Sequence, residues 1–389
     1  MNDSAASGRQ AIEWALRSSP VLDGFVRRKL ADRALAGKRV AVVGRLDAKI
    51  AVLATVLADG GAAVVVADSS PESTSAGVTA ALAERGVEVH ARQLLSVADT
   101  EPDYIIDEGA ALTARMASDR PDAYARLRGV LEGTTDGLTT LTELAALGHL
   151  HMPALAASGA ECKRLFEDRH GTAQTTVQAI LQLTNLRMYG KRVAVVGYRQ
   201  LGRGVAMYCH QLGAQVTVIE IDPIRGLEAH ADGHDVASLE TALGSSDFVI
   251  TTTGNSRVVS THHFDALTDG TILANAGHGD HEIDIVALRA QSSDETEIRP
   301  GVTAFTRNGI TTYVLVDGAL VNVAGGKGQP SEVVDLASSV HALGCHYLAS
   351  HEVASGLHPY PADLDRAIAA AKLTSRGITI DGIQTRGSE

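Results

Sequence analysis

The stretch that decides the fold is Gly190-Lys191-Arg192-Val193-Ala194-Val195-Val196-Gly197, an apolar run that ends at a glycine. Gly202 and Gly204 follow, and a second apolar run, 215–219, ends at Glu220, 23 positions beyond Gly197. This order predicts a strand, a turn, a helix and a second strand, with a dinucleotide pyrophosphate at the helix N-terminus. An acidic residue after the second strand accepts a ribose 2′-hydroxyl and repels a 2′-phosphate, so the pattern favours NAD over NADP.

The glycine fingerprint has one departure, because its middle position is Arg199. This position normally lets the backbone approach the pyrophosphate closely, so a side chain here either points away or contacts a phosphate itself. We therefore predict a cofactor site in which Arg199 is a candidate phosphate ligand. The candidate cofactor residues of this segment are Gly197, Arg199, Gln200, Leu201, Gly202, Glu220 and Ile221.

The same eight residues, Gly-Lys-Arg-Val-Ala-Val-Val-Gly, also occur at positions 37–44. There they continue as Arg45-Leu46-Asp47-Ala48-Lys49, without the further glycines that a dinucleotide needs. Short Val/Ile/Ala runs alternate with longer amphipathic segments along the whole chain, which predicts βαβ units. With 389 residues, the chain is long enough for two cores. We expect an α/β protein with two doubly wound parallel-sheet domains, the second a Rossmann domain inserted in the first.

The composition excludes several classes of protein. Hydrophobic residues make up 45% and charged residues 21%, and the formal net charge of −12 disfavours a nucleic-acid partner. Three widely spaced cysteines form no CxxC pair, so neither a metal site nor a disulfide framework is expected. The N-terminal 30 residues lack the apolar core of a signal peptide, and no apolar run reaches the length of a membrane helix. We expect a cytoplasmic protein without a membrane partner.

A series of motifs resembles the S-adenosylhomocysteine hydrolase family. It begins at the glycine loop and continues in the family's order through Thr251-Thr252-Thr253-Gly254, Asn275-Ala276-Gly277-His278, Glu282-Ile283-Asp284 and Leu320-Val321-Asn322. In the first half it covers Ile105-Ile106-Asp107-Glu108-Gly109, positions 128–135 and positions 162–168, and near the end it covers Leu357-His358-Pro359-Tyr360-Pro361. The resemblance adds Thr252, Thr253, Gly254, Asn255, Asn275, Gly277, His278 and Asn322 to the candidate cofactor residues.

The resemblance also implies a domain organisation and a reaction. Residues 1–171 and 333–389 would form the substrate and catalytic domain, and residues 172–332 the NAD-binding domain. Family members hold NAD and use it twice, oxidising a ribose hydroxyl and later reducing the ketone, with elimination of homocysteine and addition of water between. A homodimer or homotetramer is expected, although the family's C-terminal Lys/Tyr tail, which reaches a neighbouring cofactor site, is missing.

The catalytic candidates match family positions. Lys163 matches the lysine that handles the oxidised hydroxyl, and His278 matches the histidine near the leaving group and water. Glu108 stands where the family has a catalytic aspartate, and keeps the carboxylate. Glu167 and Asp168 replace an aspartate and an asparagine that follow the lysine.

The substrate-binding positions depart from the family. A histidine and a threonine are replaced by Arg45 and Asp47, and the glutamate that reads the adenine amino group is replaced by Lys49. A second glutamate becomes Gly133, and the histidine of the last glycine loop becomes Gln329. The candidate substrate residues are Arg45, Asp47, Lys49, Glu132, Thr134, Thr135, Lys327 and Gln329. Because a donor in place of an acceptor rejects the original ligand, we expect a different small-molecule substrate.

Three interpretations stay open. The first is an adenosylhomocysteinase-like enzyme acting on a nucleoside-like or other hydroxylated thioether or ether. The second is an NAD-dependent dehydrogenase with a small anionic hydroxy substrate, since Arg45, Lys49, Lys163 and Lys327 are candidates to converge on a carboxylate or phosphate. The third is a catalytically silent NAD-binding regulatory protein.

Overall fold

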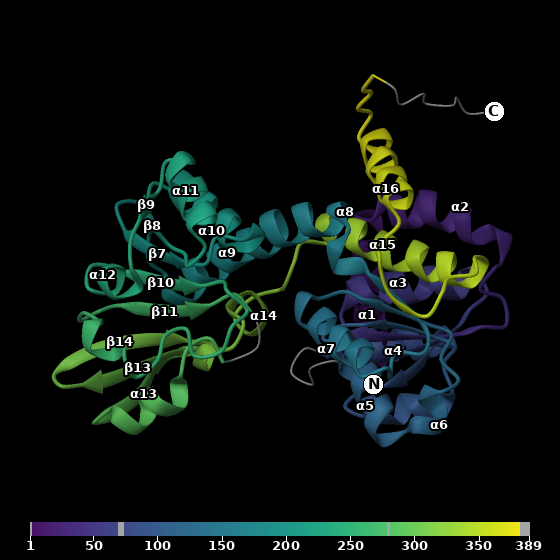
Figure 1. The fold of residues 1–389 in the computed structure, drawn as a ribbon, viewed down its shortest axis with the longest axis horizontal. Coiled ribbons are helices and arrows are strands. Elements are labelled where there is room, and N and C mark those ends of the chain that lie inside the picture. The colour runs from purple at the N-terminus through teal and green to yellow at the C-terminus, as the bar shows by residue number, and fades with distance from the viewer. Residues whose placement is uncertain (1, 69–73, 278–280, 382–389) are drawn as a thin grey trace. The chain divides into compact units, whose positions relative to one another are not determined.

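The computed structural model describes residues 2–68, 74–277 and 281–381 (Figure 1). The chain forms two compact units. The first unit combines Met1–Phe166 with Ser331–Glu389, and the second is Glu167–Pro330. Each unit is built on its own sheet, as expected of an α/β protein whose second sheet domain is inserted in the first.

The sheet of the first unit has seven strands in the order β15-β6-β5-β4-β1-β2-β3, and all neighbouring strands are parallel. The chain begins in the middle of the sheet and winds outward in both directions, which is the doubly wound topology. The strands are β1 (Arg39–Gly44), β2 (Ala63–Asp68), β3 (Glu88–His90), β4 (Tyr104–Asp107), β5 (Gly129–Glu132), β6 (Pro153–Ala156) and β15 (Gly356–Pro359).

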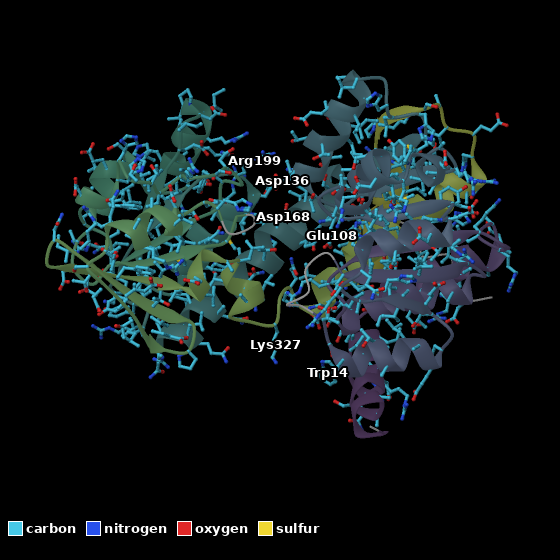
Figure 2. All side chains as sticks on the ribbon, turned by 90° about the horizontal axis from the view of Figure 1, so that it is seen from below. Trp14, Glu108, Asp136, Asp168, Arg199 and Lys327 are labelled. Carbon is cyan, nitrogen blue, oxygen red and sulfur yellow. The ribbon has the colours of Figure 1, made fainter. Side chains whose placement is uncertain are left out.

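Helices connect and cover these strands. The single tryptophan of the sequence, Trp14, projects from the first helix with 71% of its surface exposed (Figure 2). The helices are α1 (Asn2–Arg17), α2 (Arg27–Lys29), α3 (Ala48–Asp59), α4 (Ala76–Glu84), α5 (Ala111–Asp119), α6 (Pro121–Tyr124), α7 (Thr135–Ala146), α8 (Glu161–Lys163), α15 (Ser331–Ser350) and α16 (Ala362–Ser375).

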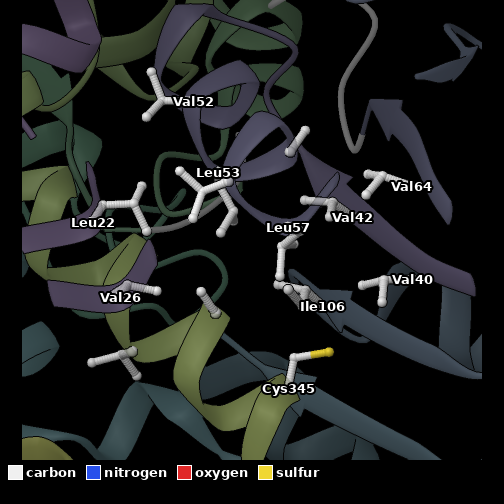
Figure 3. Packing of buried hydrophobic residues seen from close by; sticks show 14 of the residues in the cluster. Leu22, Val26, Val40, Val42, Val52, Leu53, Leu57, Val64, Ile106 and Cys345 are labelled. Carbon is white, nitrogen blue, oxygen red and sulfur yellow. The ribbon is translucent and has the colours of Figure 1, made fainter. Parts of the chain in front are cut away.

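The alternating side chains of β1 show how two apolar cores form. Val40 and Val42 belong to one buried cluster, and Ala41 and Val43 belong to another on the opposite face. In the first cluster, side chains of α3, β2, β4 and α15 meet those of β1 (Figure 3). Since both faces are covered, the strand is apolar throughout, and this explains the unbroken Val/Ala run in the sequence.

The sheet of the second unit has eight strands in the order β12-β13-β14-β11-β10-β7-β8-β9. The six strands β14, β11, β10, β7, β8 and β9, which are consecutive in the sheet, are parallel to one another. β13 runs antiparallel to both of its neighbours, β12 and β14. The strands are β7 (Arg192–Val196), β8 (Gln215–Ile219), β9 (Asp235–Val236), β10 (Phe248–Thr251), β11 (Ile272–Asn275), β12 (Asp294–Arg299), β13 (Val302–Arg307) and β14 (Ile310–Leu315).

The antiparallel edge is a feature that the parallel-sheet prediction missed. Asn308 and Gly309 join β13 to β14 with φ of 51° and 78°, the left-handed pair that a two-residue hairpin turn requires. The Asn-Gly dipeptide is the sequence signal for this hairpin. All residues of β12 are exposed, as is typical of a charged edge strand.

The helices of the second unit are α9 (Ala173–Thr184), α10 (Gln200–Gln211), α11 (Pro223–Ala231), α12 (Leu239–Leu243), α13 (Ile285–Gln291) and α14 (Val321–Ala324). A π-helical segment, Arg164–Thr172, precedes α9. Among the residues that the structure describes, no helix is long and apolar enough to span a bilayer.

In both sheets the winding direction reverses at the centre, between β1 and β4 in the first unit and between β7 and β10 in the second. Loops diverge from the carboxyl ends of parallel strands at such a point, and ligands of open α/β sheets bind there. Many of the candidate site residues follow the carboxyl ends of these strands or of their neighbours, among them Arg45, Glu108, Glu132, Gly197, Glu220 and Thr252.

Candidate active site

The glycine loop of the second unit lies between β7 and α10. Gly197 has φ of +98°, a conformation that favours glycine. A Cβ on Gly202 would lie 1.9 Å from the Gly197 carbonyl oxygen, and a Cβ on Gly204 would lie 2.0 Å from the Arg169 carbonyl oxygen. Glycine is therefore required both for the tight turn and for the close packing of α10.

Arg199 occupies the middle fingerprint position without backbone strain. Its φ of −74° and ψ of −169° are extended, and it directly precedes the first turn of α10. Its side chain is exposed (Figure 2). In the next residue, the buried Gln200 Oε1 has no hydrogen-bond partner within the described chain. Backbone N–H groups at a helix N-terminus attract a phosphate, so this end of α10 fits the pyrophosphate of a dinucleotide.

Glu220, at the end of β8, is held by three backbone N–H groups. Its Oε2 accepts from Tyr198 at 2.8 Å, and its Oε1 accepts from Ile221 at 2.8 Å and Asp222 at 3.1 Å. These bonds fix the carboxylate beside the glycine loop, in an orientation suited to a ribose hydroxyl. The Ile221 side chain is 94% exposed, so it offers an apolar surface next to that carboxylate.

Glu282 organises the loop after β10, and the sequence prediction did not include it among the site residues. This carboxylate is 1% exposed, and it accepts from the Thr253 N–H at 3.1 Å, the Thr253 hydroxyl at 3.0 Å and the Gly254 N–H at 2.6 Å. A Cβ on Gly277 would lie 1.7 Å from Glu282 Oε1, so Gly277 is required for this arrangement. Thr252 donates to the carbonyl oxygens of Val196 and Gly197, and thereby ties the loop to the end of β7.

Two of the three candidate asparagines of the second unit, Asn275 and Asn322, are buried. Asn275 donates to the Gly318 carbonyl at 2.9 Å and accepts from the Gly277 N–H at 3.0 Å, so it braces the turn after β11. Asn322 has a buried Oδ1 that, in the ranges described, has no hydrogen-bond partner. An unpartnered buried amide oxygen is costly, and a bound ligand with a donor would offset that cost. Leu201 and Asn255 lie in α10 and after β10, and His278 lies outside the described residues.

In the first unit, the loop after β1 carries three candidate residues. Asp47 caps α3 by accepting from the N–H groups of Lys49 at 2.8 Å and Ile50 at 3.3 Å. The Lys49 ammonium is 2.9 Å from the Asp47 carboxylate, so Lys49 carries a compensating partner. Arg45 differs, because its buried Nε and Nη1 have no hydrogen-bond partner in the part of the chain described.

Glu132 is completely buried at the end of β5. Its carboxylate accepts from the N–H groups of Gly109, Ala110 and Thr134 and from the Thr134 hydroxyl, at 2.6 to 3.1 Å. A Cβ on Gly137 would lie 2.1 Å from Glu132 Cδ, so the glycine makes room for the carboxylate. Burial and the neighbouring charge of Asp107 raise the pKa of Glu132 to about 8. The buried Glu132 carboxylate therefore joins the loop after β4 to the loop after β5 by hydrogen bonds to both.

Thr134 is the N-cap of α7, where its hydroxyl accepts from the Gly137 N–H at 3.0 Å, and Thr135 is the exposed first residue of that helix. Glu108 follows β4 and is part-buried (Figure 2). A Cβ on Gly44 would lie 3.4 Å from the Glu108 carboxylate, so Glu108 approaches the end of β1 closely. The structure thus brings the loops after β1, β4 and β5 together around a shared edge.

Lys163 is part-buried and lies on α8, a short helix whose first N–H groups are held by the C-terminal helix α16. The Asp365 carboxylate accepts from the N–H groups of Glu161 at 2.6 Å and Cys162 at 3.0 Å. Asp365 is 8% exposed. The carboxylate satisfies helix donors that would otherwise lack acceptors, and so fixes the position of the segment that carries the lysine.

Comparisons with known proteins show the family to which the chain belongs. Residues 168–328 match the family model described as S-adenosyl-L-homocysteine hydrolase, NAD binding domain. An adenosylhomocysteinase of Gloeobacter violaceus is 39% identical, over 97% of this chain and 91% of that protein. The chain belongs to the adenosylhomocysteinase family. An S-inosyl-L-homocysteine hydrolase of Methanopyrus kandleri is 38% identical, over 97% of this chain and 92% of the relative.

Membership in the adenosylhomocysteinase family makes this chain an NAD-dependent enzyme, and NAD is its cofactor. The glycine cradle and the unpartnered Asn322 oxygen described above fit that cofactor. A solved structure, the dipicolinate synthase A chain of Bacillus subtilis, covers 82% of this chain and 100% of its own with a TM-score of 0.50 and 14% identity, which shows similarity of fold alone. Among the described residues, no cluster of His, Cys, Asp and Glu is arranged to hold a metal ion.

The remaining candidates lie in the second unit. Glu167 and Asp168 are part-buried on the π-helical segment Arg164–Thr172. Lys327 is exposed, and the Gln329 amide donates to the Thr172 hydroxyl at 3.3 Å. Lys163, Arg45 and Lys49 belong to the first unit, whereas Lys327 belongs to the second, so convergence of the four cations stays a hypothesis.

Proposed function

We propose that this enzyme hydrolyses a thioether between homocysteine and a hydroxylated, nucleoside-like group. NAD, when bound, would supply reversible hydride transfer at the carbon that bears a substrate hydroxyl, so that the overall reaction is redox-neutral. The observation that carries the proposal is the environment of Lys163. This lysine lies on a helix anchored by Asp365, in a chain that is 38–39% identical to adenosylhomocysteinase-family enzymes over almost its whole length. The test is release of homocysteine from S-inosyl-L-homocysteine and from S-adenosyl-L-homocysteine.

In this proposal the first unit binds the substrate and supplies the proton-transfer groups. Lys163 receives the proton of the hydroxyl that is oxidised, and Glu108 acts as an acid or base at the neighbouring carbon. Glu132 and Thr134 orient the loops that surround Lys163 and Glu108, and Thr135 is the first residue of α7. The second unit carries the other candidate catalytic residues, Glu167, Asp168 and His278.

The second unit holds NAD. Gly197, Gly202 and the N-terminus of α10 would hold the pyrophosphate, and Glu220 would accept hydrogen bonds from the ribose hydroxyls. The Asn322 Oδ1 would accept a hydrogen bond at the nicotinamide end. Thr252, Thr253, Gly254, Asn255, Asn275 and Gly277 form the loops around the cofactor. The domain limits proposed from the sequence, with 172–332 as the NAD domain, follow the same division of roles.

Lys49 favours a 6-oxopurine over adenine. Its ammonium donates hydrogen bonds, so it suits a carbonyl oxygen better than an exocyclic amino group, which is itself a donor. Two relatives are named S-inosyl-L-homocysteine hydrolase, and the substrate in that name contains a 6-oxopurine. We expect S-inosyl-L-homocysteine to be cleaved with at least tenfold higher kcat/KM than S-adenosyl-L-homocysteine. Equal rates on both, with Lys49→Glu unchanged, would contradict this role of Lys49.

Arg45 favours a second candidate, a dehydrogenase of a small anionic hydroxy compound. Its buried Nε and Nη1, which have no acceptor in the described chain, suit a carboxylate or phosphate. Asp47, Lys49, Lys327 and Gln329 would then border the anion. The two candidates differ in their products, because a dehydrogenase accumulates free NADH with turnover and the redox-neutral enzyme does not.

We further infer a cytoplasmic homodimer or homotetramer. All three cysteines are free and buried, as expected in a reducing compartment. Size-exclusion chromatography with light scattering measures the assembly directly, and a monomeric mass would contradict the inference.

A further inference from the structure

His341 lies in the middle of α15, facing the carboxyl end of β5. The residue is 6% exposed, and its buried Nε2 has no hydrogen-bond partner among the residues described. A buried imidazole nitrogen without a partner is unfavourable, because folding removes it from water and supplies no replacement hydrogen bond. Such a group points to a ligand that supplies the missing hydrogen bond.

Gly133 leaves room for the His341 ring. A Cβ on Gly133 would lie 3.0 Å from His341 Nε2 and 3.3 Å from Cε1, so a side chain at position 133 would displace the ring. One turn further along α15, a Cβ on Gly344 would lie 2.3 Å from the Leu131 side chain. The two glycines let α15 approach β5, and the imidazole thereby occupies the space in front of Gly133.

The charge of Lys163 acts on His341. Burial and, secondly, the positive charge of Lys163 lower the pKa of His341 to about 3. The imidazole is therefore neutral at pH 7, with one ring nitrogen as donor and the other as acceptor. A neutral imidazole, which donates at one ring nitrogen and accepts at the other, is suited to a hydroxyl, which also donates and accepts.

We propose that His341 is a specificity-determining substrate contact, whose Nε2 hydrogen-bonds a ribose hydroxyl of the substrate at the carboxyl end of β5, next to Gly133. The proposal rests on the proposed function, because it takes the substrate hydroxyl to be handled by Lys163. It adds a residue outside the motifs that carry the family resemblance, on a helix far from Gly133 in the sequence.

The test compares nucleosides that differ by one hydroxyl, using the NAD-loaded enzyme and isothermal titration. Inosine, 2′-deoxyinosine and 3′-deoxyinosine are titrated into the wild type, His341→Ala and His341→Gln. We expect the wild type to bind inosine about tenfold more tightly than one of the deoxynucleosides. His341→Ala removes that difference, and His341→Gln, whose amide also donates and accepts, retains part of it.

Two further variants keep the outcome interpretable. Gly133→Ala displaces the ring without removing it and is expected to reduce the same discrimination, whereas His346→Ala, on the same helix, leaves it unchanged. His346 hydrogen-bonds Asp32 at 2.8 Å. Full hydroxyl discrimination in folded His341→Ala or, should that variant not fold, in Gly133→Ala overturns the contact while the proposed function stands. Absence of nucleoside binding by the wild type overturns the proposed function and the contact with it.

Discussion

Asp365 holds Cys162 at two points. The Cys162 N–H donates to Asp365 Oδ1 at 3.0 Å, and the Cys162 thiol donates to the Asp365 carbonyl oxygen at 3.3 Å. Since Lys163 is the next residue, the C-terminal helix α16 determines where the proposed catalytic lysine lies. Burial, together with the hydrogen bond and charge of Asp365, raises the pKa of the Cys162 thiol.

Asp365→Ala is expected to lower kcat at least tenfold while the KM changes little, because the lysine loses its support and the substrate pocket persists. Loss of the two backbone hydrogen bonds to a buried carboxylate lowers the free energy of unfolding by about 3 kcal/mol. Alkylation mapped by mass spectrometry should find Cys162 unreactive in the wild type and reactive in the variant. Asp363→Ala, exposed on the same helix, is the matched control. A variant with normal kcat would show that Asp365 has no positioning role.

The raised pKa of Glu132 predicts how the free energy of unfolding changes with pH. Its pKa is raised from 4.5 to about 8, so the folded protein keeps a proton that the unfolded chain releases above pH 4.5. The free energy of unfolding therefore falls as pH rises from about 4.5 to about 8, and burial raises the pKa of Asp107 in the same direction.

Urea melts at several pH values, followed by the fluorescence of Trp14, report the unit that holds Glu132 (Figure 2). Glu132→Gln does not titrate and should show a flatter dependence across this window. Glu143→Gln, exposed on α7, should follow the wild type. A wild-type stability that rises with pH through the window would contradict the assignment.

Gly202 is predicted to be indispensable for NAD binding. In Gly202→Ala the new Cβ meets the Gly197 carbonyl oxygen, which forces the loop away from the pyrophosphate. We expect at least a tenfold loss of NAD affinity in calorimetry. The control is Gly226→Ala on α11, where the nearest atom to a Cβ is 3.8 Å away. Equal NAD affinities in the two variants would show that the loop accommodates the added methyl group without weakening NAD binding.

Arg199 is predicted to contribute a phosphate contact. Its exposed guanidinium lies next to the first turn of α10, and its extended backbone needs no glycine. Arg199→Ala should weaken NAD binding about tenfold, and the loss should shrink at high salt as the charge is screened. Arg199→Gly separates backbone freedom from charge. Tighter binding by either variant would show that the arginine only replaces a better glycine.

Much of the fold was accessible from the sequence because it depends on local patterns. The glycine spacing after Gly197 and the apolar runs predicted the two doubly wound sheets and the NAD cofactor. The antiparallel edge was missed, although Asn308-Gly309 carries the signal of a hairpin turn. The βαβ periodicity predicts only parallel strands, whereas this hairpin is indicated by the residues of its turn.

The site was accessible only in part. Asp47 and Thr134 were identified as site residues, but their places as helix caps depend on backbone geometry. Glu282 and His341 were not identified as site residues, because each acts on a segment that its position in the sequence does not indicate. Glu282 bonds a loop 28 residues away, and His341 meets Gly133 only once α15 packs on β5.

The product balance of the purified, NAD-loaded enzyme with S-inosyl-L-homocysteine decides whether the reaction is a redox-neutral hydrolysis. We expect homocysteine and inosine in equal amounts over many turnovers, without net formation of NADH, and loss of both products in Lys163→Ala at unchanged NAD content. Parallel reactions with S-adenosyl-L-homocysteine rank the two bases. Failure to release homocysteine from either thioether, or NADH accumulating with each turnover, would contradict the proposed hydrolysis.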